Sequence, residues 1–233
     1  MTRPRSALIV SHGQPSDPEP ADRELARLAA RVARALPGWH VGSATLALPG
    51  ALDAELAVAG PAPSVYPMFM TEGWFTGENL RDRLAKAPDA RVLRPLGVSP
   101  DLPGLAADLI GDEIARAGWS PGETRLFLAA HGSGRSPNSA RDTRAFAAAL
   151  ARHIALAEIS VGFVEQPPYL ADAATGMGER SLCLPFFAAA GGHVTDDIPE
   201  ALDKADFSGL RLAPLGLAPA VPDLVARAIA PDR

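Results

Sequence analysis

An internal duplication is the sequence feature that most limits how this chain can fold. Four short motifs occur twice, in the same order, with members 118 or 119 residues apart. The pairs are Ser11-His12-Gly13 with Ala130-His131-Gly132, residues 45–49 with 163–167, 65–69 with 183–187, and 94–97 with 213–216. Motifs that recur at a near-constant separation indicate tandem copies of one structural unit. The sequence therefore predicts two lobes of similar fold, over residues 1–119 and 120–233.

Each copy alternates short apolar segments with longer amphipathic ones. In the second copy, the segments 125–130, 159–164 and 182–187 have the length of strands, whereas 137–153 and 194–204 have the length and pattern of helices. Strands that alternate with helices are typical of parallel sheets, because two parallel strands need a crossover connection. The pattern predicts an α/β fold with two tandem, doubly wound parallel-sheet lobes.

Polar side chains follow three predicted strands of the second copy. His131 comes directly after the first strand, Glu165 after the second, and His193 after the third. Open parallel sheets bind ligands beyond the carboxyl ends of their strands, so we expect these side chains to converge. Two imidazoles and a carboxylate suit a divalent first-row metal or the acceptance of protons from a substrate. The alternative is that each histidine only closes a turn.

The first copy provides an internal control for this interpretation. It has His12 opposite His131, but Ala47 opposite Glu165. Phe75 stands opposite His193, with Trp74 before it. A requirement of the fold would be met in both copies, so the difference favours a functional site in residues 120–233 and a degenerate one in residues 1–119. For His12, three interpretations stay open: a relic, a turn-closing residue, or a contributor to a second site.

Further candidates surround these positions. The loop 132–138 contains two glycines and precedes a helix, so we expect its amides, with Ser133, Arg135 and Asn138, to bind carboxylates of a substrate. Glu72, Trp74 and Phe75 are candidates for the opposite wall of a cleft between the lobes, where aromatic rings suit a flat ligand; ordinary packing is the alternative. His40 and His153 are expected to be structural.

Composition narrows the class of protein. A formal net charge of −5 argues against nucleic acid or an anionic membrane as a partner, since both reward clustered Lys and Arg. No apolar run reaches the roughly 18 residues of a membrane span, and no targeting signal is evident, so a cytoplasmic protein is expected. The single cysteine, Cys183, lies in an apolar segment and is expected to be a buried small hydrophobe.

Three motifs of the second copy resemble the class II tetrapyrrole chelatases, specifically the sirohydrochlorin cobalt/iron chelatases of cobalamin and siroheme biosynthesis. They are AHGSG at 130–134, GFVEQP at 162–167 and LPFFAAAGGHVTDDIP at 184–199. The resemblance implies two chelatase-like lobes and a lyase that inserts cobalt or ferrous iron into sirohydrochlorin or a related tetrapyrrole. It implies that His131 and His193 bind the metal, and that Glu165 lies at the metal and helps to remove pyrrole protons. The implied partners are the tetrapyrrole and the divalent metal, with no cofactor beyond that metal substrate.

The sequence also departs from this family's pattern. The first copy lacks two of the three site groups, residues 166–169 are not the commonest form of that segment, and a cysteine cluster is missing. Two other functions stay open: a non-catalytic metal- or tetrapyrrole-binding protein, and a doubly wound module that binds phosphate or flavin. The choice among cobalt, iron and nickel is open as well, because imidazole and carboxylate accept all three.

Overall fold

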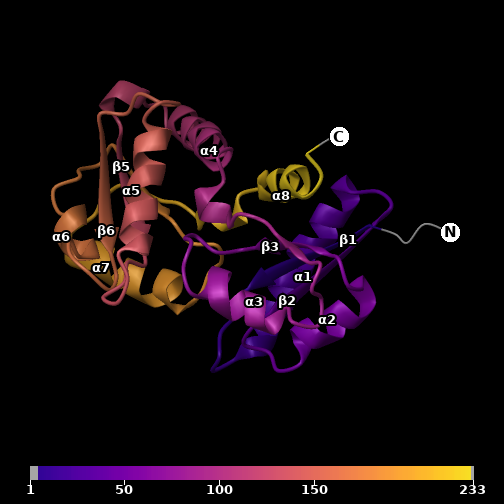
Figure 1. Ribbon diagram of the computed structural model, residues 1–233. Coiled ribbons are helices and arrows are strands. Elements are labelled where there is room, and N and C mark those ends of the chain that lie inside the picture. The colour runs from indigo at the N-terminus through magenta and orange to yellow at the C-terminus, as the bar shows by residue number, and fades with distance from the viewer. Residues whose placement is uncertain (1–4, 232–233) are drawn as a thin grey trace. The chain divides into compact units, whose positions relative to one another are not determined.

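The computed structural model describes residues 5–231, so the outermost residues of both expected lobes, 1–4 and 232–233, lie outside the described part. It contains two four-stranded parallel sheets, with strand orders β2-β1-β3-β4 and β6-β5-β7-β8 (Figure 1). The strands are β1 Arg5–Ser11, β2 Trp39–Thr45, β3 Ser64–Pro67, β4 Arg91–Val92, β5 Arg125–Ala130, β6 Glu158–Phe163, β7 Ser181–Pro185 and β8 Leu210–Arg211. The prediction of two tandem parallel-sheet lobes is confirmed.

Helices cover both faces of each sheet. They are α1 Pro18–Ala35, α2 Ala51–Ala59, α3 Leu80–Arg83, α4 Leu102–Arg116, α5 Asn138–Leu150, α6 Leu170–Ala174, α7 Ile198–Lys204 and α8 Val221–Ile229. Short 3₁₀ and π-helical turns complete the order: η1 Phe75–Asn79, η2 Leu96–Val98, η3 Pro121–Glu123, η4 His193–Asp197 and η5 Leu215–Leu217. Within residues 5–231, none of these helices combines the length and the apolar character that crossing a bilayer requires.

Successive side chains of the central strands point to opposite faces of the sheet, and because both sets are apolar, each sheet is covered on both sides. In β1, Leu8 and Val10 point to the face that α2 and α3 cover, where they join one apolar cluster with Leu56 and Leu80. Ile9 points to the other face and is fully buried as well. Right-handed crossovers to strands on opposite sides of β1 place α1 and α2 on opposite faces. The result is a doubly wound three-layer unit.

The second sheet repeats this arrangement. Phe127 and Cys183 point to the face covered by α6 and α7, in a cluster with Leu170 and Leu202. On the other face, α5 lies along β5 and β6, with α4 packed against it (Figure 1). The phenyl ring of Phe146 in α5 lies 4.6 Å from that of Phe186, measured between centroids.

The two compact units of the structure do not have the same boundaries as the two sequence repeats. One unit comprises Met1–Leu96 together with Pro219–Arg233, and the other comprises Gly97–Ala218. The last long helix of each repeat therefore packs with elements of the other repeat: α8 packs against α1 and β3, and α4 packs against α5. We call these units the first and second unit. A repeat boundary after residue 119 remains a prediction about the sequence.

Candidate metal centre

Three predicted site residues lie together at the carboxyl ends of the second unit's strands. His131 directly follows β5, Glu165 comes two residues after β6, and His193 begins η4 after β7. One ligand atom from each residue lies within 4.8 Å of the other two. The two imidazoles are half-buried and Glu165 is exposed. Across residues 5–231, this is the one group of three histidine, cysteine or acidic residues so placed.

Backbone hydrogen bonds beyond the formal strand ends fix two of these residues side by side. The amide of Val164 donates to the carbonyl of Ala130, and the amide of Glu165 donates to the carbonyl of His131, both at 3.0 Å. The β5–β6 ladder thus continues for two further bonds. Glu165 is placed beside His131 by main-chain geometry, independently of any side-chain contact.

The next residue, Gly132, allows the chain to turn away directly after His131. Its φ is +71°, in the left-handed region that favours glycine. A Cβ there would lie 2.8 Å from Cγ of Gln166 and 2.9 Å from Cβ of Phe163, so this position also has no room for a side chain. Gly13 has the same conformation in the first unit, with φ +77°. In both copies, the left-handed backbone conformation therefore explains why a glycine follows the histidine.

Hydrogen bonds select the same ring nitrogen of both histidines for a metal. The Nδ1 of His131 lies 2.9 Å from the carbonyl oxygen of Gly132, and a carbonyl can only accept, so Nδ1 donates its proton. The Nδ1 of His193 lies 2.5 Å from a carboxylate oxygen of Asp197. In a neutral imidazole whose Nδ1 carries the proton, Nε2 keeps the lone pair. Nε2 is therefore the ring nitrogen that both histidines have available for a metal; the ring centroids are 4.6 Å apart and the ring planes are at 89° to each other.

The loop after His131 is braced from within. The hydroxyl of Ser133 accepts hydrogen bonds from the amides of Arg135 and Ser136, each at 3.2 Å. The hydroxyl of Ser136 accepts one from the amide of Asn138 at 3.3 Å. These amides already donate to serine hydroxyls of the same loop. This weakens the expectation that they bind an anion, and it therefore also weakens the interpretation as a phosphate-binding module. Substrate binding by the side chains of Ser133, Arg135 and Asn138 stays a prediction.

The first unit has the same framework without the ligand set. The amide of Ala47 donates to the carbonyl of His12 at 2.9 Å, as that of Glu165 does to His131. The rings of His12 and Phe75 are 4.5 Å apart, close to the 4.6 Å between His131 and His193. Since neither Ala47 nor Phe75 carries a ligand atom, His12 stands there as a single imidazole.

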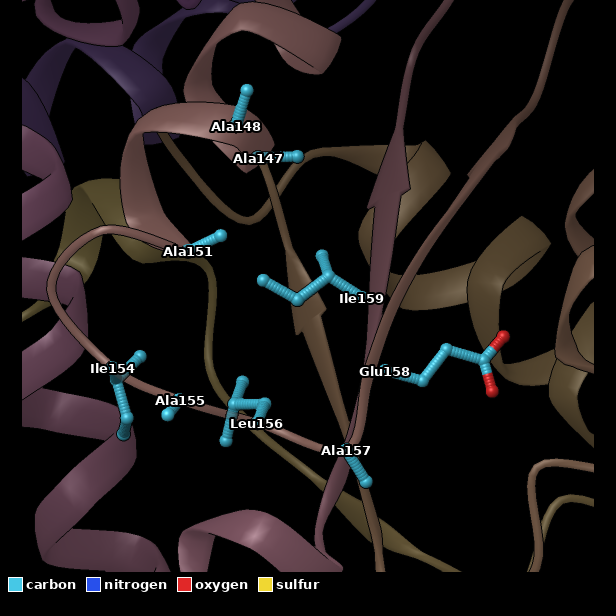
Figure 2. Close-up of a pocket in the computed structure, with 9 residues that line it drawn as sticks. All are labelled: Ala147, Ala148, Ala151, Ile154, Ala155, Leu156, Ala157, Glu158 and Ile159. Atoms are coloured by element: carbon cyan, nitrogen blue, oxygen red, sulfur yellow. The ribbon is translucent and has the colours of Figure 1, made fainter.

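A hollow in the second unit lies at the opposite edge of the sheet. It is formed by the last turns of α5 and the segment that leads into β6, so it lies at the amino end of that strand (Figure 2). Its lining is apolar apart from Glu158, whose carboxylate points away from the alanines and lies 3.5 Å from Nε of Arg125. Side chains such as Ala151, Ile154 and Ile159 carry no group that could bind a metal or accept a proton, so the hollow is not part of the candidate centre.

Two partners of the site residues were not predicted from the sequence. Asp197 accepts from the ring of His193, and the side-chain oxygen of Gln166 accepts from the amide of Ser133 at 2.8 Å. Gln166 thereby joins the loop after His131 to the segment that carries Glu165. A spacing of four residues on one helix was the available signal for Asp197. No sequence pattern pointed to Gln166.

Comparisons with known proteins identify the family and agree with the fold. A model of the CbiX family matches residues 125–231. The solved structure of CbiX, described as the terminal enzyme for biosynthesis of siroheme in denitrifying bacteria, is 48% identical over 98% of this chain and 100% of that one, with a TM-score of 0.90. A search of curated proteins finds no match.

More distant structures share the fold. SirB from Bacillus subtilis, solved with Fe³⁺, is 15% identical over 97% of this chain and 94% of its own, with a TM-score of 0.72. A multi-domain protein of Deinococcus radiodurans with structural similarity to chelatases is 22% identical over 99% of this chain and 56% of its own, with a TM-score of 0.74. At these identities the likeness establishes the fold alone.

Proposed function

The chain belongs to the CbiX family, and on this premise we propose that it inserts a divalent metal ion, cobalt or ferrous iron, into sirohydrochlorin. The observation that carries the proposal is the placement of His131, Glu165 and His193 in one unit, with ligand atoms within 4.8 Å of one another. The CbiX with which the chain shares 48% identity is described as an enzyme of siroheme biosynthesis.

Three protein ligands suit a metal that the protein must transfer to the macrocycle. Catalytic metal sites typically keep three protein ligands and leave a coordination position for substrate, whereas structural sites are closed by four. A metal with bonds of roughly 2.1 Å to each ligand atom requires these atoms to be at most about 4.2 Å apart, so in our proposal side-chain rotations draw them together when the metal binds. The open position would take a pyrrole nitrogen, so the macrocycle can replace the protein ligands one at a time.

Insertion also requires proton acceptors, because two of the four ring nitrogens that bind the metal must lose their N–H protons. In our proposal the carboxylate of Glu165, the exposed member of the cluster, accepts the first proton. The imidazoles of His131 and His193 lose the metal as it moves to the ring, so they become free to accept the second. No nucleotide or electron donor enters this reaction.

The decisive experiment is anaerobic incubation of the protein with sirohydrochlorin and Co²⁺ or Fe²⁺, followed by the absorbance of the metallated product. We expect product in molar excess over protein, since an enzyme turns over. A stoichiometric limit of one product per chain would indicate a non-catalytic binding protein instead. Glu165→Gln should bind Co²⁺ through the two imidazoles but form product slowly, and His153→Ala, an exposed histidine outside the cluster, should match the wild type.

A further inference from the structure

The peptide group between Gly132 and Ser133 makes two hydrogen bonds beside the candidate metal centre. Its carbonyl oxygen accepts from Nδ1 of His131, at 2.9 Å. Its N–H donates to Oε1 of Gln166, at 2.8 Å. A trans peptide group is planar, and its N–H and C=O point in opposite directions, so a partner that holds the N–H also fixes where the carbonyl points. Gln166 and the ring of His131 are therefore linked through one rigid group, the peptide group 132–133.

This peptide group needs a partner that holds its direction. Gly132 has no Cβ and a φ of +71°, and glycine accepts more backbone conformations than any other residue. Rotation of the peptide group about its neighbouring bonds would turn the carbonyl away from His131. The ring would then lose the acceptor that keeps the proton on Nδ1 and the lone pair on Nε2.

Gln166 extends from a segment of main chain that is fixed on both sides. Before it, the amide of Glu165 donates to the carbonyl of His131 at 3.0 Å. After it, the carbonyl of Pro168 accepts from the amide of Phe163 at 2.9 Å. The side chain of Gln166 therefore starts from a defined place next to His131.

The side chain of Gln166 is itself well packed. Its stem lies against Gly132, where an added Cβ would be 2.8 Å from its Cγ. The residue is half-buried, so water competes less for its hydrogen bond to the Ser133 amide. The hydroxyl of Ser133 in turn accepts from the amides of Arg135 and Ser136, which holds Ser133 in place within its loop.

The first unit has the same main-chain framework without this link. Leu48 stands in place of Gln166, and Gln14 in place of Ser133. A leucine side chain cannot accept a hydrogen bond, and the side-chain amide of Gln14 donates to the hydroxyl of Ser16 at 3.1 Å. The link thus belongs to the copy that has the metal ligands, and the fold does not require it. This favours a role in the site over a role in folding.

We propose that Gln166 is a positioning residue for metal binding, which sets the orientation and the tautomer of His131 through the peptide group 132–133. It does for His131, across one intervening group, what Asp197 does for His193 by direct contact. Both imidazoles then present an unprotonated Nε2 before the metal arrives. The use of this centre in metal insertion rests on the proposed function, whereas the tautomer of His131 and the affinity for the metal alone do not.

The first test is the tautomer of His131 in the metal-free protein. Long-range ¹H–¹⁵N correlation spectra of the imidazole-labelled protein at about pH 9, where neutral imidazole is expected, distinguish Nδ1–H from Nε2–H. The chain has five histidines, and His131→Ala identifies the signals of His131. We expect Nδ1–H in the wild type. Gln166→Leu should shift the ring toward Nε2–H, the tautomer that has no lone pair on Nε2.

The second test is the affinity for Co²⁺ without sirohydrochlorin, followed by the visible spectrum of bound Co²⁺. Gln166→Leu should lower this affinity about tenfold or more, the usual effect of losing a group that orients a metal-binding histidine. Gln166→Glu keeps an oxygen acceptor at this position, so it should keep the Nδ1–H tautomer and most of the affinity. Gln166→Met keeps an unbranched stem without that acceptor and should behave like Gln166→Leu.

The first unit provides the matched control. Gln14→Leu removes a glutamine from the corresponding loop, and it should leave both the tautomer of His131 and the Co²⁺ affinity as in the wild type. Leucine fits this framework, since the first copy has Leu48 at the position of Gln166. Denaturant unfolding shows that each variant is folded, and should Gln166→Leu fail to fold, Gln166→Met gives the same comparison.

The outcomes separate this inference from the proposed function. An unchanged tautomer of His131 or an unchanged Co²⁺ affinity in folded Gln166→Leu overturns the inference. A loss of affinity in Gln166→Glu as large as in Gln166→Leu overturns it as well, because the acceptor is then not what matters. Loss of both properties in the leucine variant, with both kept in the glutamate variant, supports the inference even when the wild type forms no metallated product, a result that refutes the proposed function alone.

Discussion

The imidazole Nδ1 of His193 lies 2.5 Å from a carboxylate oxygen of Asp197, one turn further along η4. Helical spacing brings the two residues together, and the π-helical form of the turn is shared with η1 in the first unit, where Phe75 replaces the histidine. The carboxylate fixes the ring orientation and the tautomer, which leaves Nε2 with the lone pair. Such partners of metal-binding histidines are a regular feature of metal sites.

Replacing Asp197 by Ala should lower the affinity for Co²⁺ about 10- to 100-fold, the usual effect of losing the carboxylate behind a metal-binding histidine. Thermal stability should change little, because the side chains of His193 and Asp197 are 40% and 48% exposed. Titration followed by the visible spectrum of bound Co²⁺ gives the affinity. Asp196→Ala, at the neighbouring exposed position, is the matched control; equal affinities in the two variants would contradict the assigned role of Asp197.

His131→Ala and His193→Ala should each nearly abolish metal insertion at saturating Co²⁺, since one imidazole and one carboxylate remain. His12→Ala should keep the Co²⁺ affinity of the wild type, because Ala47 and Phe75 give it no partner ligands. Metal affinity and initial rate of insertion are measured for all three. Normal metal binding by the His193 variant together with loss in the His12 variant would show that the active copy has been misassigned.

The near-identity of the two frameworks predicts a gain of function. Ala47→Glu with Phe75→His places a carboxylate and an imidazole around His12, where the ring spacing of 4.5 Å matches the 4.6 Å of the second unit. The double variant should bind two Co²⁺ ions per chain instead of one, by equilibrium dialysis. Phe75→His alone is the control and should bind the second ion much more weakly. A stoichiometry of one in the double variant would refute the equivalence of the two sites.

Gly132→Ala should destabilise the fold by about 1–3 kcal/mol, because it combines a strained positive φ with contacts of 2.8 and 2.9 Å to Gln166 and Phe163. Metal affinity should fall too, since the substitution displaces the loop next to His131. Gly134→Ala is the matched control in the same loop: its Cβ would meet no atom closer than the carbonyl oxygen of Glu165 at 3.9 Å. Denaturant unfolding and Co²⁺ titration compare the two variants.

Burial raises the pKa of the Cys183 thiol to about 12, against a smaller lowering by the charge of Arg211. The folded state holds the thiol proton more tightly than the unfolded state does. This difference contributes fully to the free energy of unfolding below pH 9.0, the ordinary pKa, and the contribution is lost as the pH rises from there toward 12. The free energy of unfolding of Cys183→Ala should therefore fall less over this range than that of the wild type. In the folded protein the thiol should resist alkylation at pH 9 and react quickly in denaturant; rapid reaction of the folded chain would contradict its burial.

The sequence by itself determined the architecture and the place of the candidate metal centre. Apolar segments of strand length that alternate with helices permit little besides parallel sheets, and parallel sheets gather residues after successive strands at one edge. His131, Glu165 and His193 therefore had to approach one another once the strands were located. The near-constant separation of the repeats also paired Ala47 with Glu165, which the main-chain hydrogen bonds of both units reproduce.

Only the tertiary structure decided how these residues are held. The contact of Asp197 with His193, the brace from Gln166 to Ser133, and the engagement of the loop amides depend on side-chain direction, which motif spacing does not encode. The packing of α4 in the second unit and of α8 in the first depends on contacts between segments distant in the chain. An amphipathic helix requires an apolar surface to cover, but its sequence does not state which of two similar sheets provides that surface.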